Sequence, residues 1–141
     1  MRFMVIVKAD QKSEAGVLPD EKLLVAIGKL NEEMIKAGVM LAGEGLQPSS
    51  KGARVKFSGG KRTVTDGPFS ETKELVGGFW LIQVKSKEEA IEWASRVPFE
   101  DGEIEIRQVS EASDFEPAIK TAAGAEVLAA EAAFRAKHAK S

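Results

Sequence analysis

Cysteine is missing from the 141-residue chain, and its only histidine is His138, close to the end. Without cysteine the protein can form neither a disulfide bond nor a thiolate zinc site, and it has no cysteine nucleophile. With a single terminal histidine, a Ser-His-Asp triad, a multi-histidine metal centre and most histidine-based acid–base schemes are almost excluded. We therefore expect no metal, no cofactor and no functional role for His138.

The chain also has no long apolar run and no large excess of either positive or negative side chains. The apolar run at residues 3–7 is too short for a signal peptide or a membrane span, so we expect a cytosolic protein. The 20 basic and 22 acidic side chains leave a net charge of −2. A chain with this balance has no overall positive field to attract nucleic acid, which is not an expected partner.

The pattern of apolar residues predicts the order β-α-β-hairpin-β-α-β over residues 2–110. Residues 2–8 and 79–84 are apolar on both faces, which is typical of strands inside a sheet. The other predicted segments are edge strands at 39–46 and 103–107, a hairpin at 53–57 and 61–65 around Gly59-Gly60, and loops at 9–17 and 66–78.

Two helices complete this pattern. The first, at residues 19–37, ends before Gly38 and is expected to bury Leu23, Ile27, Leu30 and Met34, with Leu24 and Ile35 widening the apolar stripe. The second begins with a capping box made by Ser86 and Glu89 and ends before Pro98. Its expected buried residues are Ala90, Ile91, Ala94 and Val97.

This order of elements predicts an α+β, ferredoxin-like antiparallel sheet of split βαβ type with an inserted hairpin. Right-handed crossovers place both helices on one face and leave the other face, still apolar along the central strands, uncovered. We therefore expect a homodimer that packs through the sheets. Residues 1–112 are predicted to form this domain, and residues 113–141 an alanine-rich extension with a helix at 115–139.

The most unusual sequence in the chain is Asp66-Gly67-Pro68-Phe69. The aspartate can accept hydrogen bonds from amides of its own loop, the glycine admits a positive φ and the proline fixes the direction of the exit, which predicts a rigid turn. Phe69 is expected to anchor the loop in the core. The pattern fits a structural turn, and it fits equally a pocket whose rim carries Asp66 and Lys73.

Glu44 lies between two glycines, which lets a ligand or another backbone approach closely, although a bulged edge strand explains the same pattern. If Glu44 and Asp66 meet in a dry pocket, one carboxyl keeps its proton and the pair supplies an acid and a base. The last predicted strand, at 103–107, could line the same cavity, or it could form a solvated edge of the sheet. The candidate catalytic residues are Asp66 and Glu44, and the candidate ligand-binding residues are Lys73, Arg107, Glu105 and Phe69.

Several segments of the chain together resemble one known family. They are Gly43-Glu44-Gly45-Leu46-Gln47-Pro48, Thr63-Val64-Thr65-Asp66-Gly67-Pro68-Phe69, Glu71-Thr72-Lys73, Gly77-Gly78-Phe79, Ala90-Ile91-Glu92-Trp93-Ala94 and Ile104-Glu105-Ile106-Arg107. With them, residues 1 to about 110 resemble the DGPF-domain branch of the YCII-related proteins.

The resemblance implies a ferredoxin-like chain assembled as a dimeric α+β barrel. In the family at large, a His–Asp pair with its histidine on the first helix is proposed as catalytic, and this chain has no histidine at 19–37. Most DGPF-domain proteins have no assigned activity. Some occur beside, or fused to, extracytoplasmic-function sigma factors.

Two functions remain open at this level, besides that of a structural dimer without a pocket. One is acid–base chemistry, lyase-like or hydrolase-like, on a small polar organic compound, with Asp66 and Glu44 as proton carriers and Lys73 or Arg107 holding an anionic group. The other is a non-catalytic regulatory or interaction module, linked to sigma-factor control of transcription, which contacts its partner through the hairpin or the C-terminal helix.

The hairpin region has a basic strip without a single acid between Glu44 and Asp66. The strip consists of Lys51, Arg54, Lys56, Lys61 and Arg62. It could meet phosphate or an acidic patch on a partner, or it could protect the exposed edges of the hairpin from pairing with other chains.

Overall fold

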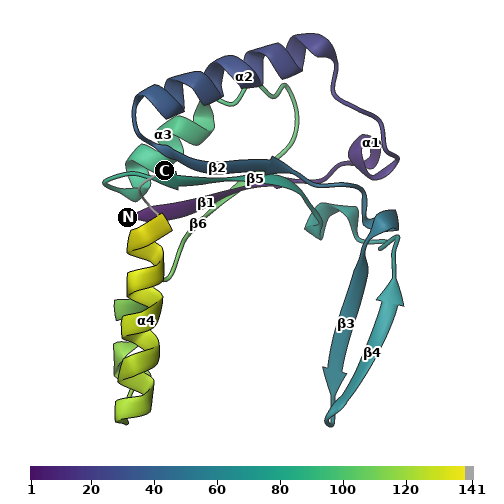
Figure 1. Cartoon of the computed structure of the whole chain (residues 1–141). Helices are drawn as coiled ribbons and strands as arrows, with labels where there is room; N and C mark the ends of the chain where they lie inside the picture. The colour runs from purple at the N-terminus through teal and green to yellow at the C-terminus, as the bar shows by residue number, and fades with distance from the viewer. Residues whose placement is uncertain (139–141) are drawn as a thin grey trace. The chain divides into compact units, whose positions relative to one another are not determined.

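A computed structural model describes residues 1–138, apart from the side chains of Lys73 and His138 (Figure 1). The chain divides into two compact units, Met1–Arg107 and Gln108–Ser141. In chain order the elements are β1 (Arg2–Lys8), α1 (Gln11–Glu14), α2 (Glu21–Lys36), β2 (Met40–Gly45), η1 (Ser49–Lys51), β3 (Ala53–Ser58), β4 (Lys61–Asp66), η2 (Thr72–Glu74), β5 (Val76–Gln83), α3 (Lys87–Ser95), β6 (Ile104–Gln108), η3 (Ala112–Ala118) and α4 (Ala122–His138).

The main sheet has the strand order β2-β5-β1-β6, and β5 pairs antiparallel with both β1 and β2. The two strands that are apolar on both faces are therefore central, as predicted. Figure 1 shows α2 and α3 on the same side of this sheet, which confirms the expectation from right-handed crossovers. The α+β, ferredoxin-like fold class is thus confirmed.

The core of the first unit lies between the sheet and these two helices. It is built from alternate residues of the central strands and from single faces of the helices. The buried members are Phe3, Val5, Leu30, Met34, Val39, Trp80, Ile82, Val84 and Ala90.

Helix α2 confirms the predicted helix, with small corrections at its ends and on its surface. Asp20 caps its first turn by accepting a hydrogen bond from the Leu23 amide (2.8 Å), and Gly38 follows its end with φ +71°. Leu24 and Ile35 do not widen the buried stripe, because they are 54% and 60% exposed. Successive residues are about 100° apart around a helix, and the sheet covers only the narrow face centred on Leu30 and Met34.

Helix α3 begins with the predicted serine cap, but the reciprocal bond differs. The Glu89 amide donates to Ser86 Oγ (3.1 Å), whereas the Glu89 carboxylate accepts from the Lys85 amide (2.9 Å) instead of from Ser86 itself. The predicted burial of Ile91 is wrong, since its side chain is exposed. Ile91 follows the fully buried Ala90. Because successive residues are about 100° apart around a helix, its side chain points away from the core.

The predicted loop at residues 9–17 contains the short helix α1, which the sequence reading missed. Asp10 and Ser13 form a capping box, in which the Ser13 amide donates to Asp10 Oδ1 (2.7 Å) and the Asp10 amide donates to Ser13 Oγ (3.0 Å). The signal that could have revealed this turn is the spacing of Asp10 and Ser13.

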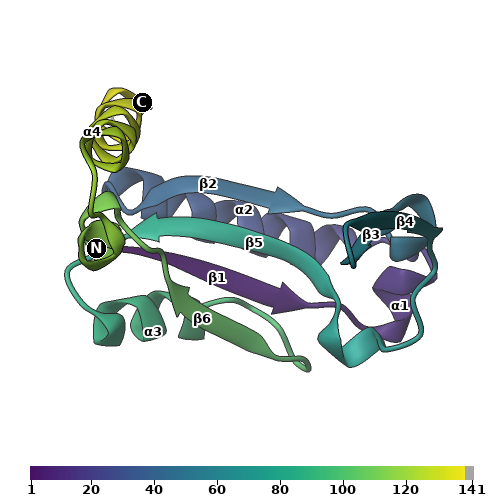
Figure 2. The same ribbon diagram turned by 90° about the horizontal axis from the view of Figure 1, so that it is seen from below.

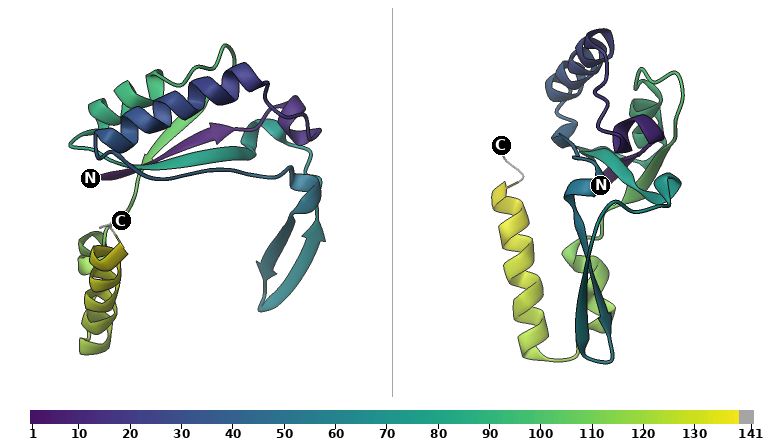
Figure 3. Two further views of the ribbon diagram at one scale, coloured as in Figure 1. Left: turned by 45° about the horizontal axis from the view of Figure 1, so that its top comes forward. Right: turned by 90° about the vertical axis from the view of Figure 1, so that its right-hand side faces the viewer.

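The predicted hairpin is confirmed as β3 and β4. Gly59 and Gly60 occupy its turn, with φ values of +56° and +80°, a backbone conformation that strongly favours glycine. Figure 3 shows in two further orientations how the hairpin extends away from the main sheet.

Strand β5 begins at Val76, earlier than the predicted strand at 79–84. Gly77 and Gly78 have no side chains that could show alternation, yet Gly78 pairs with both Val7 and Gly45. A Cβ atom on Gly78 would lie 2.9 Å from the Glu44 carbonyl oxygen, so the absence of a side chain allows this close pairing.

The second unit differs in detail from the predicted helix at 115–139. Residues 112–118 form the 3-10 helix η3, which contains Pro117, and α4 begins only at Ala122. Thr121 Oγ accepts a hydrogen bond from the Gly124 amide (3.1 Å), which explains the late start, and Ile119 lies outside the helix in an extended conformation. Residues 139–141 lie outside the described residues.

The core assignment predicts a contrast between two aliphatic side chains. Ile82→Ala should lower the free energy of unfolding by about 2–5 kcal/mol, because it leaves a cavity between the sheet and the helices. Leu24→Ala, on the exposed side of α2, should change it by less than about 0.5 kcal/mol. Urea unfolding followed by tryptophan fluorescence measures both, and equal losses would contradict this description of the core.

Candidate functional site

One face of the main sheet has no helix over it within residues 1–107, and Figure 2 looks onto this face. Residues directly opposite each other in an antiparallel pair point to the same face. Leu81 is opposite both Met4 and Ala42, while Phe79 is opposite both Ile6 and Glu44. This uncovered face therefore has an apolar floor made by half-buried side chains of the two central strands, Met4, Ile6, Phe79 and Leu81. Glu44 stands at the end of one row.

The β6 edge of the same face carries charges. Because Ile104 and Ile106 pack against the core, alternation turns Glu105 and Arg107 to the uncovered side. Lys8 Nζ lies 3.1 Å from one oxygen of Glu105, and the Arg107 guanidinium lies 3.3 Å from the other. The hydrogen bond from Lys8, followed by that from Arg107, lowers the pKa of the Glu105 carboxyl below its ordinary value.

The Asp-Gly-Pro-Phe loop is held by a group of contacts centred on Ser49, the Ser49 knot, formed by Glu14, Ser49, Gly67 and Phe69. The Ser49 amide donates to one Glu14 oxygen (2.9 Å), and its hydroxyl donates to the other. The Phe69 amide donates to Ser49 Oγ (3.0 Å). These bonds tie the end of α1 and the start of η1 to the loop. The two hydrogen bonds from Ser49 lower the pKa of Glu14.

The Ser49 knot corrects two details of the predicted turn. Gly67 does not have a positive φ; it is needed because a Cβ atom there would lie 1.7 Å from the Ser49 carbonyl oxygen. Among the described residues no hydrogen bond reaches the Asp66 carboxylate, because the loop amides are used elsewhere: Gly67 donates to the Gly52 carbonyl (3.0 Å) and Phe69 to Ser49. The Gly67–Pro68 peptide bond is cis.

The candidate catalytic residues lie at exposed positions. Asp66 is the last residue of β4 and pairs with Ala53, while Glu44 is the next-to-last residue of β2. Both side chains are exposed, so the single chain does not supply the dry surroundings that would keep one of the carboxyls protonated. Their roles stay predictions.

The candidate ligand-binding residues are dispersed. The prediction that Phe69 anchors the loop in the core is wrong. The Arg54 guanidinium lies over the Phe69 ring, 3.8 Å from its centre. Glu105 and Arg107 lie together at the β6 edge, where Arg107 is exposed. The Lys73 side chain, like that of His138, lies outside the described residues.

The model of the YCII-related domain family matches residues 1–113. The chain belongs to the YCII-related family. An uncharacterised protein of Rhizobium meliloti (strain 1021) is similar to it, with 35% identity over 75 residues, which is 53% of this chain and 60% of the relative. This YCII-related chain thus matches 60% of that relative's length, and the relative's name assigns it no activity.

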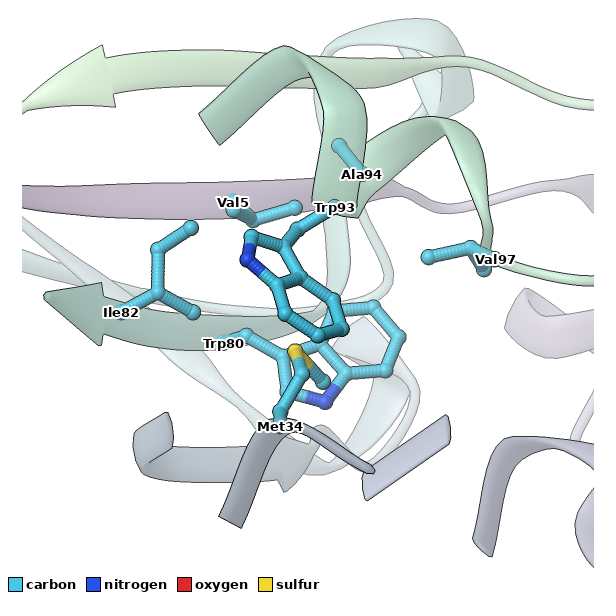
Figure 4. Close-up of a pocket in the computed structure, with 7 residues that line it drawn as sticks. All are labelled: Val5, Met34, Trp80, Ile82, Trp93, Ala94 and Val97. Carbon is cyan, nitrogen blue, oxygen red and sulfur yellow. The ribbon is translucent and has the colours of Figure 1, made fainter. Parts of the chain in front are cut away.

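The described part of this YCII-related protein contains a small core gap and an open groove, and the groove has room for more than a water molecule. The first is a core gap of about 10 Å³ between Trp80 and Trp93, which Figure 4 shows among its apolar neighbours. Trp80 is a buried core residue, and the half-buried Trp93 packs against the core. The Trp80 indole N–H donates to Asn31 Oδ1 (2.9 Å), which satisfies the one polar group of the ring.

The second hollow is an open groove of about 330 Å³, which we call the α3–β6 groove. Its residues come from α3, from the following loop and from β6: Ile91, Ala94, Ser95, Val97, Phe99, Glu100, Asp101, Gly102, Glu103, Ile104 and Ile106. The sequence reading missed this feature. The exposed Ile91 and the acidic run Glu100-Asp101-Gly102-Glu103 are the signals that could have indicated it.

The described residues of the YCII-related chain contain no metal-ligand cluster and no membrane-spanning helix. Within residues 1–138, no group of three or more His, Cys, Asp or Glu side chains is arranged to hold a metal ion. Over the same residues, no helix combines the length and the hydropathy that a membrane span requires.

The Ser49 knot predicts that a methyl group at Gly67 disrupts the loop. Gly67→Ala should cost about 1–3 kcal/mol of unfolding free energy, because the Ser49 backbone must move. It should also speed hydrogen exchange at the Phe69 amide. Gly45→Ala is the matched control, since nothing lies within 4 Å of its Cβ position. Unchanged exchange at Phe69 in the Gly67 variant would contradict the assignment.

The lowered pKa of Glu14 predicts a pH-dependent contribution to stability. A carboxyl with a depressed pKa stabilises the fold above its unfolded value, here 4.5, and this stabilisation is lost as the pH falls through the folded value. Glu14→Gln should therefore unfold at lower urea concentration than the parent chain at pH 7, and the difference should shrink below about pH 4. A difference that is constant from pH 7 to pH 3 would contradict this.

Proposed function

We propose that this YCII-related protein is a homodimer that binds a small polar organic compound where two uncovered sheet faces meet. The observation that carries the proposal is the composition of that face. Four apolar side chains form its floor, Glu44 lies at one edge, and Glu105 with Arg107 lies at the other. Apolar patches rimmed by polar residues are typical of interaction sites and ligand-binding grooves.

Dimerisation would change the surroundings of the carboxylates. Two sheets that pack face to face lie about 10 Å apart, and the side chains between them are shielded from water. In the dimer, Glu44 next to Phe79 passes from a solvated position to one shielded from water. This supplies the dry environment that the single chain does not have.

The ion pairs of each carboxylate indicate which role it takes in the proposed reaction. Glu105 is held by Lys8 and Arg107, and its lowered pKa keeps it ionised, so it orients Arg107 and does not donate a proton. Arg107 is exposed and can hold an anionic group of the ligand. Glu44 and Asp66, which have no ion pair in the described chain, are left as the proton carriers of a lyase-like or hydrolase-like reaction.

A thermal-shift screen against polar metabolites tests the proposal. A ligand at 100 times its dissociation constant should add about 2.7 kcal/mol, which raises the melting temperature by several degrees for a chain of this size. Asp66→Asn and Glu44→Gln should abolish or weaken the shift, whereas Glu32→Gln, on the exposed surface of α2, should leave it intact. A shift that is unchanged in both site variants would exclude them from the ligand site.

Analytical ultracentrifugation tests the dimer within the same design. We expect a species of twice the 15.2 kDa of one chain, and Leu81→Glu should convert it to monomer because it places a charge in the apolar floor. Loss of the ligand shift in this variant would place the ligand site at the interface. A parent chain that sediments as a monomer would contradict the proposal.

A non-catalytic interaction module is the second candidate. It is favoured by α4, on which Val127 and Phe134 are 65% and 62% exposed. A screen without any shift would favour this role, with a protein partner such as a sigma factor. A pull-down with and without residues 115–141 then distinguishes the surfaces, because undiminished capture by the shortened chain would exclude α4.

A further inference from the structure

The hairpin formed by β3 and β4 has one apolar face that the described chain leaves uncovered. Every residue of both strands is exposed. The pairing places Val55 opposite Val64 and Phe57 opposite Arg62, so these four side chains share one face. The three apolar ones are 50%, 66% and 67% exposed for Val55, Val64 and Phe57.

An isolated hairpin of this kind is marginally stable in water, and it needs a surface to pack on. At its base, the Arg54 side chain lies over Phe69. Towards its tip, Arg62 lies over the Phe57 ring, 5.1 Å from the ring centre. The face near the tip therefore presents an aromatic ring and a cation together, which we call the Phe57–Arg62 pair. Arginine and aromatic residues are the side chains most enriched among those that dominate interface energetics.

The α3–β6 groove has the complementary composition. Its lining residues include the apolar side chains of Ile91, Phe99 and Ile104 and the acidic residues Glu100, Asp101 and Glu103. No cation lines the groove. The hairpin region, in contrast, has five cations and no acid between Glu44 and Asp66.

We propose that the Phe57–Arg62 pair of one copy docks in the α3–β6 groove of a second copy. The ring covers the apolar lining residues, and Arg62 meets the carboxylates. In a two-fold dimer the contact occurs twice, because each copy has one hairpin and one groove. The inference rests on the proposed dimer and adds to it a second contact surface, outside the packed sheet faces.

The geometry of the hairpin agrees with this arrangement. Figure 1 shows it pointing to the side of the sheet opposite α2 and α3, which is the side on which a second copy would pack in the proposed dimer. A strand of six residues is about 20 Å long, whereas two packed sheets are about 10 Å apart. The hairpin is thus long enough to pass the partner's sheet and reach a groove beside the partner's α3.

Cross-linking tests the contact directly, since the chain has no cysteine of its own. Copies with Ser58→Cys, next to the turn, are mixed with differently tagged copies with Asp101→Cys and treated with a short bifunctional thiol reagent. We expect a mixed cross-linked dimer. Ser58→Cys mixed with Glu32→Cys, on the exposed side of α2, is the control. Cross-linking no stronger than in this control would overturn the proposal.

A charge exchange tests the recognition. Arg62→Glu should raise the dissociation constant of the dimer about tenfold or more, which is a common effect of losing a central interface side chain. Adding Asp101→Arg and Glu103→Arg to the same chain should restore most of the affinity. Lys22→Glu, on α2, should have little effect. Failure of the triple variant to regain affinity would overturn the pairing of hairpin and groove.

Variants on the two surfaces separate this inference from the sheet-face dimer. If Leu81→Glu abolishes the dimer while Arg62→Glu and Phe57→Ser leave its dissociation constant unchanged, the groove contact is wrong and the sheet-face dimer stands. If the hairpin variants dissociate the dimer and Leu81→Glu does not, the groove contact stands without the packed sheets. A monomeric parent chain would overturn both.

Discussion

Right-handed crossovers place α2 and α3 on the same face of the main sheet, and the other features of the first unit follow from this asymmetry. The covered face buries Phe3, Val5, Trp80 and Ile82, and this packing supplies the core. The same two central strands present Met4, Ile6, Phe79 and Leu81 on the opposite face, where no helix of residues 1–107 lies. A domain built in this way has its core on one side of the sheet and an uncovered apolar surface on the other. Association through this uncovered surface is therefore the physical basis of the proposed function.

In the Asp-Gly-Pro-Phe motif, some residues hold the loop in place, whereas the aspartate is exposed to solvent. Gly67 and Phe69 hold the loop against Ser49, one through the absence of a side chain and the other through its amide. Asp66 takes no part in these contacts, although it is adjacent to them. A rigid loop thus carries an exposed carboxylate, which is the arrangement expected where a scaffold positions a functional group.

The carboxylates on the uncovered face differ in their surroundings. Glu105 is engaged by two cations, which fixes its charge, whereas Glu44 stands beside an aromatic ring at the free end of a row. Acid–base chemistry without histidine requires carboxyls whose pKa values differ, and exclusion of water is the means of separating them. In the proposed dimer a second copy provides that exclusion, and the proposed contact between the hairpin and the α3–β6 groove would give the second copy a specific position.

Much of the fold was determined by the sequence itself. Apolar residues on both faces marked β1 and β5 as central, glycines located the hairpin and the end of α2, and the serine cap located α3, because these are local signals of periodicity and backbone conformation. Only the tertiary structure decided which apolar side chains of the helices are buried and which distant residues contact each other. Leu24, Ile35 and Ile91 were predicted as buried, since a helical pattern shows which residues are apolar but not how wide a face the sheet covers. The Ser49 knot joins residues distant in the chain, and no local pattern of charge or hydropathy contains the distances between them.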